Sequence, residues 1–121
     1  MTLLKAEAAA LLARLPGPPS PGWPDGETFC RALAHGSMSV EIYAPVGTDP
    51  QTPHEQDELY IVHAGRAVFA LGGERHAVVP GTVFFVPAGV EHRFVEFTPD
   101  FSAWVVFWGP VGGEAAGAGG S

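Results

Sequence analysis

The fold can be read from residues 80–96, PGTVFFVPAGVEHRFVE. Two short β-prone runs, TVFFV and HRFVE, flank the turn-forming tripeptide PAG. Runs of four to eight β-branched and aromatic residues bounded by Gly or Pro are typical of strands, and neither run has a helical period. The segment therefore predicts two short strands with a tight turn at residues 87–89 between them.

The same pattern of β-prone runs separated by Gly and Pro turns continues through residues 27–110. β-prone runs lie at residues 28–34, 37–44, 58–64, 66–71, 75–79, 82–86, 92–97 and 101–108. The sequence LGGE, residues 71–74, predicts a two-residue hairpin turn, because glycine supplies the positive φ that such turns need. About eight short strands at regular spacing predict an all-β sandwich or barrel.

The two ends of the chain differ from this middle part. In residues 2–15, Leu4, Ala8, Leu11 and Leu15 recur at helical spacing, and Thr2 can cap the helix. Residues 16–26, PGPPSPGWPDG, cannot join a regular ladder and predict an extended arm. Residues 111–121 predict a disordered Gly/Ala tail. The expected organisation is a helix and Pro-rich arm over 1–26, a β-barrel over 27–110 and the tail.

Composition excludes several classes of function. The 121 residues carry a formal charge of −7 with only six Lys and Arg, which argues against nucleic acid and anionic membranes. One cysteine cannot form an intrachain disulfide and fits a reducing compartment. No apolar run approaches the roughly 18 residues of a membrane span. We expect a cytoplasmic protein that binds a small molecule.

The segment around residues 80–96 also carries a spaced motif. Gly81, Pro87, Gly89 and His92 fall at the positions of the second motif of the cupin superfamily, G-x5-P-x-G-x2-H-x3-N, and Glu96 stands where asparagine is usual. The resemblance covers roughly residues 36–109. It implies a small single-domain cupin, a monocupin of the cupin-2 type, folded as a double-stranded β-helix or jelly-roll barrel.

An earlier segment, TPHEQDELYIVHAG at residues 52–65, is similar to the first cupin motif. His54, Glu58 and Gly65 keep the spacing of the second histidine, the glutamate and the closing glycine, whereas Thr52 replaces the first histidine. The resemblance therefore implies a metal site reduced to His54, Glu58 and His92. Two histidines and one carboxylate resemble the facial triad of non-haem iron oxygenases, and such ligands suit Fe, Mn, Ni or Zn.

Other side chains are candidates for supporting roles. Thr52 and Gln56 could hold a metal-bound water, and Thr52 alternatively marks a barrel that no longer binds metal. Glu96 shares strand parity with His92 and is a candidate general base, or else a carboxylate at the barrel mouth. Tyr60 shares the face of Glu58 and could meet a substrate, although core packing is the simpler interpretation.

Two functions follow from this site. One is a small-molecule metalloenzyme, of which an Fe- or Mn-dependent dioxygenase is the favoured version. The other is a non-catalytic cupin that binds or senses a small molecule. Strands that are apolar on both faces also predict a homodimer.

Overall fold

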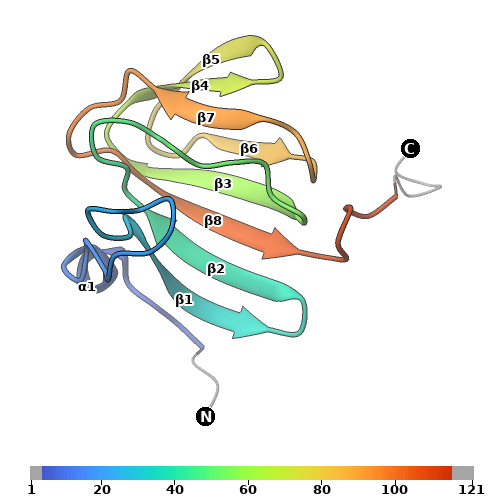
Figure 1. The fold of residues 1–121 in the computed structure, drawn as a ribbon, viewed down its shortest axis with the longest axis horizontal. Coiled ribbons are helices and arrows are strands. Elements are labelled where there is room, and N and C mark those ends of the chain that lie inside the picture. The colour runs from blue at the N-terminus through green and yellow to red at the C-terminus, as the bar shows by residue number, and fades with distance from the viewer. Residues whose placement is uncertain (1–3, 116–121) are drawn as a thin grey trace.

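The computed structural model describes residues 4–115 as two antiparallel sheets packed face to face (Figure 1). The five-stranded sheet has the order β1-β2-β8-β3-β6, and the three-stranded sheet has the order β5-β4-β7. The strands are β1 (Phe29–His35), β2 (Met38–Tyr43), β3 (Asp57–Ala64), β4 (Ala67–Leu71), β5 (Glu74–Val78), β6 (Val83–Val86), β7 (His92–Val95) and β8 (Ser102–Trp108).

The predicted all-β jelly roll is confirmed, and each predicted run overlaps one strand. The hairpin between β4 and β5 turns through Gly72 and Gly73, with φ of 53° and 93°. Only glycine adopts such angles at low cost, which is why LGGE is a reliable turn signal.

The core lies between the two sheets and consists of the inward positions of alternating strands. On β3, Glu58, Tyr60 and Val62 are buried, as the period of two predicts. Tyr60 packs on Phe69 and Phe94 of the smaller sheet, with ring centroids 5.6 and 5.2 Å apart. These aromatic contacts join the two sheets beside the candidate site.

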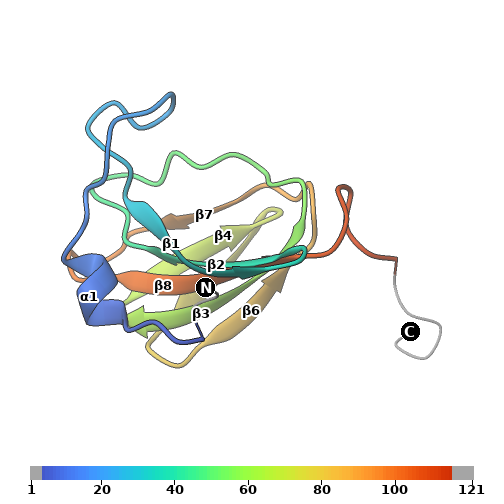
Figure 2. The same ribbon diagram turned by 90° about the horizontal axis from the view of Figure 1, so that it is seen from below.

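The outer face of the larger sheet is partly covered by α1 (Ala8–Leu12) (Figure 2). Ala8 and Leu11 pack there against Ala32 and Ile42. The short N-terminal helix is confirmed, but it covers fewer residues than the predicted 2–15. Leu4 before it is 90% exposed, and Leu15 packs on the same cluster from beyond its end. The predicted cap Thr2 lies outside the described residues.

The Pro-rich segment is not an extended arm. The amide of Gly17 donates to the carbonyl of Glu27, and the amide of Glu27 donates to the carbonyl of Pro18. Trp23 packs edge-on against Phe29 and Tyr43. As predicted, the segment joins no strand ladder, but it is a compact loop anchored by an aromatic ring and is not extended.

Part of the predicted disordered tail, residues 111–115, is described by the structure and makes hydrogen bonds to the barrel. The amide of Gly112 donates to the carbonyl of Glu55, and the amide of Glu114 donates to Asp57 Oδ2. Residues 116–121 of the predicted tail lie outside the described residues. Within residues 4–115, no helix is long and apolar enough to cross a membrane.

Candidate metal centre

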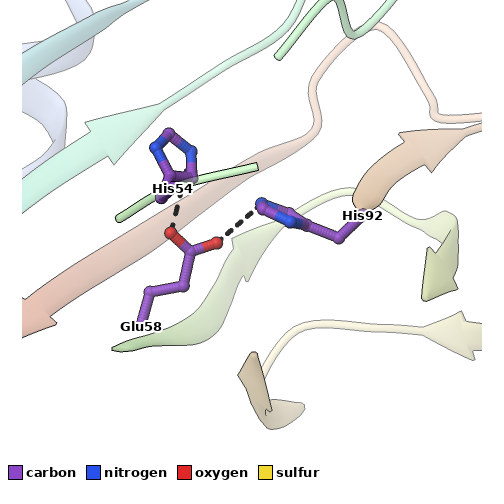
Figure 3. A group of neighbouring side chains, drawn as sticks. All are labelled: His54, Glu58 and His92. Carbon is purple, nitrogen blue, oxygen red and sulfur yellow. Dashed lines mark ion pairs between the residues drawn. The ribbon is translucent and has the colours of Figure 1, made fainter. Parts of the chain in front are cut away.

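Three side chains from separate places in the chain meet inside the barrel (Figure 3). His54 precedes β3, Glu58 lies near the start of β3, and His92 begins β7. Their ligand atoms all lie within 4.8 Å of one another. The structure therefore brings together all three residues that the sequence predicts as metal ligands.

The two motifs are joined through the backbone. The amide of Gly89 donates to the carbonyl of His54 at 2.8 Å, and Gly89 has φ of 80°. The amide of Ala88 donates to Asp57 Oδ1 at 3.0 Å. These bonds fix the turn that delivers His92 to the start of β3.

Glu58 is buried without satisfying its carboxylate. The residue is 1% exposed, and when His92 is a neutral ring neither carboxylate oxygen makes a hydrogen bond within residues 4–115. Burying such a charge costs several kcal/mol unless a cation or donor compensates it. A cation between Glu58 and its neighbours would supply that compensation.

The histidine beside Glu58 supports the same interpretation. His92 Nδ1 lies 2.8 Å from the carbonyl of Val90, to which it donates, so the neutral ring has a lone pair on Nε2. That Nε2 lies 2.6 Å from Glu58 Oε1. A lone pair and a carboxylate this close require a shared proton or a cation bound to both, and two imidazoles with one carboxylate are ligands that suit a divalent transition metal.

The two histidines differ in their affinity for protons. Burial lowers the pKa of His54, and the charge of Glu58 opposes this only in part. Burial also disfavours protonated His92, but the contact with Glu58 and the Val90 carbonyl raise its pKa above the ordinary value. His92 is therefore the ligand at which a proton and a metal ion compete.

Behind the candidate ligands lies a series of polar side chains that are hydrogen-bonded to one another, which the sequence analysis missed. Gln51 Oε1 lies 3.2 Å from His54 Nε2 and accepts a bond from the Tyr60 hydroxyl at 3.1 Å. Gln51 Nε2 donates to the buried carboxylate of Asp49, which also accepts from the Tyr43 hydroxyl and from the amide of Phe94. Residues 44–56 form a loop without periodicity, so no sequence pattern predicted this series of hydrogen-bonded side chains.

Two predicted supporting residues point elsewhere. Gln56 donates to the carbonyls of Ser37 and Gly109 at 3.0 and 2.9 Å, so it fastens strand ends and does not hold a metal-bound water. Glu96 is exposed and pairs with Arg75 on the outside of the smaller sheet. Its φ of 50° ends the alternation of β7 after Val95, so the inward direction expected from parity was wrong.

The other two candidates lie at the site. Tyr60 is fully buried, and its hydroxyl lies 3.1 Å from His92 Nε2. Thr52 lines the same cavity as His54, but its predicted hold on a water stays a prediction. The cavity has a volume of about 430 Å³ and reaches His54, Tyr60 and Gln51 from the side of β2. A small molecule in it would meet the metal centre at His54.

Comparison with known proteins places the chain in a family. The cupin domain family matches residues 39–107, more than half of the chain. An uncharacterized protein of Streptomyces coelicolor is 44% identical over 84 residues, which cover 68% of this chain and 80% of that protein.

Solved structures show the same fold. A Cupin 2 conserved barrel domain protein from Salinispora arenicola has a TM-score of 0.58 at 23% identity, covering 67% of this chain and 74% of its own. The DMSP lyase DddQ from Ruegeria pomeroyi has a TM-score of 0.59 at 26% identity, covering 69% of this chain and 48% of its own. The matched family region includes His54, Glu58 and His92, and the chain belongs to the cupin family.

Proposed function

We propose that the protein is a metal-dependent enzyme of the dioxygenase type that acts on a small molecule. The observation that carries this proposal is the unsatisfied, buried carboxylate of Glu58 beside the lone pair of His92. His54, Glu58 and His92 would hold Fe, Mn, Ni or Zn. Fe and Mn are the ions that we propose for a reaction with oxygen. A cytoplasmic location is part of the same proposal.

When bound, the ion would act as a Lewis acid or oxygen activator. Tyr60 supplies a proton donor beside it. Burial, followed by the charges of Glu58 and Asp49, raises the pKa of the Tyr60 hydroxyl well above its ordinary value. The hydroxyl therefore stays protonated near neutral pH, and the proton that it now donates to Gln51 Oε1 would turn to a substrate oxygen when a substrate binds.

A second function, non-catalytic binding of a small molecule, has its own supporting observation. Glu58 and His92 already contact each other at 2.6 Å, so a proton alone satisfies the pair. A barrel in which Glu58 and His92 share a proton keeps the aromatic cavity and needs no metal.

Metal binding is the first test. After reconstitution with Fe, Mn, Ni and Zn, we expect about one ion per chain by elemental analysis. Glu58→Gln preserves size but removes the charge, and it should weaken binding by at least about a hundredfold, the upper range for residues that only support ligands. Glu55→Gln, an exposed neighbour, is the matched control. Wild-type protein that binds none of the four ions would overturn the metalloenzyme proposal.

Oxygen consumption separates the two functions. Protein loaded with Fe(II) or Mn(II) is screened with phenolic, diketone and thiol compounds in an oxygen electrode, and uptake that depends on His54 and His92 supports the dioxygenase. Thermal stabilisation by a compound without uptake or product supports non-catalytic binding instead.

A further inference from the structure

A second carboxylate faces the cavity beside the metal centre. Glu41 lies on β2, is partly buried, and lines the same cavity as His54 and Tyr60. Within residues 4–115, no ion pair includes Glu41. Its nearest cationic neighbour is Arg31, directly across on the edge strand β1, where Arg31 is exposed to solvent.

Burial disfavours the charged form of this carboxylate. It raises the pKa of Glu41, Arg31 opposes the rise, and the charges of Glu58 and Glu27 add to it. The internal contacts of the protein therefore stabilise the carboxylate anion less well than water does. A cation bound in the cavity would stabilise it.

The lining of the cavity around Glu41 is largely aromatic. Trp23, Phe29, Tyr43 and Phe107 all line it. The rings of Phe29 and Tyr43 stand at 68° and 81° to that of Trp23, with centroids 5.3 and 6.0 Å away. The rings therefore pack edge to face and give the cavity an aromatic lining, and aromatic rings attract an organic cation.

The charges around the site also favour a cationic ligand. Glu41, Asp49 and Glu58 bring three carboxylates to the region, and no Lys or Arg lines the cavity within the described residues. A divalent ion at the ligands would offset two of these charges. The charge of Glu41 then remains, and Arg31, which is exposed to solvent, is the cation beside it.

We propose that this cavity takes a small organic cation, with its ammonium group beside Glu41 and its alkyl groups against Trp23, Phe29 and Tyr43. The far end of such a molecule would reach His54. As the substrate class of the enzyme, the inference rests on the proposed function, but the binding itself requires only Glu41 and the aromatic wall.

The test compares two molecules of one shape. Choline and 3,3-dimethylbutan-1-ol differ by the exchange of the quaternary nitrogen for carbon, so the comparison isolates the charge. Calorimetric titration at pH 8, on metal-free and metal-loaded protein, should show choline binding at least about tenfold more tightly, the size expected for a partly desolvated cation on aromatic rings.

Variants separate Glu41 from its surroundings. Glu41→Gln keeps the shape and should remove the preference for choline, whereas Arg31→Gln, which deletes the competing cation, should preserve or strengthen it. Equal binding of the two compounds by the wild type, or an unchanged preference in Glu41→Gln, would overturn the inference.

The preference for choline over its uncharged analogue should be independent of metal binding. Glu41→Gln should still bind the ion, and Glu58→Gln should still prefer choline. Protein that binds no metal but selects choline refutes only the proposed enzyme, and protein that binds metal without selecting choline refutes only the cation site.

Discussion

At the scale of single residues, His54 and His92 hold protons differently. The pKa of His54 is lowered, chiefly by burial, so this ring is already neutral at pH 7. Burial acts in the same direction on His92, but Glu58 and the Val90 carbonyl outweigh it, so the pKa of His92 is raised. A raised pKa means that protonated His92 persists to higher pH, where it excludes a metal ion.

We therefore predict that metal binding at pH 7 releases fewer than two protons, and that they come mainly from His92, since a histidine must be neutral to bind a metal. Affinity should fall as the pH is lowered from 8 to 6. Calorimetry of Zn²⁺ binding in buffers with different ionisation enthalpies measures the number directly. Release of two protons, or an affinity that rises as the pH falls, would contradict this assignment.

At the scale of the elements, β3 ends in a turn that only glycine can make. Gly65 has φ of 76°, and a Cβ there would come 2.6 Å from Phe101 Cα and 2.6 Å from Thr98 Oγ1. The close approach joins the end of β3 to the segment leading into β8. The closing glycine of the first motif is thus a packing requirement.

We predict that Gly65→Ala lowers the free energy of unfolding by about 2–5 kcal/mol, from left-handed backbone strain together with overpacking. Gly47→Ala is the matched control, because Gly47 has φ of 75° but nothing within 4 Å of the added Cβ. It should cost only about 1–2 kcal/mol. Urea denaturation of the two variants compares them, and equal losses would show that the contact with Phe101 is unimportant.

The elements also show which features a sequence can predict. Strands and turns follow from local alternation and from Gly and Pro, so all eight strands were predictable. The meeting of His54, Glu58 and His92 was predictable only from the resemblance to the cupin motifs. The direction of a side chain was predictable only inside a strand. Glu96 lies one residue beyond β7, where positive φ breaks the alternation.

The remaining features that the sequence did not predict lie in loops. Gln51 holds Tyr60 and His54, whereas Gln56, five residues later, binds backbone at the strand ends. Both are glutamines near the first motif, and nothing periodic distinguishes them. Tertiary contacts determine such positions, as they do for the Pro-rich loop that is anchored by Trp23.

At the scale of the whole molecule, the outer face of the larger sheet is only half covered. Leu59 and Ile61 of β3 pair with Phe85 and Val83 of the edge strand β6 and with Val106 and Trp104 of β8, so these six apolar side chains share one face. Trp104 packs with the α1 cluster at one end. Val83 and Phe85 at the other end are 55% and 48% exposed.

A second copy of the chain would cover this uncharged face, because a two-fold dimer brings identical apolar patches together. We predict a dimer of twice 12.7 kDa by light scattering at micromolar concentration. Val83→Lys should shift it to the monomer, since it would bury a charge in the interface. Val46→Lys is the control, because Val46 is 77% exposed on a loop outside this face. A monomeric wild type, or equal dissociation by both variants, would exclude β3 and β6 as the interface and leave their apolar face exposed to water.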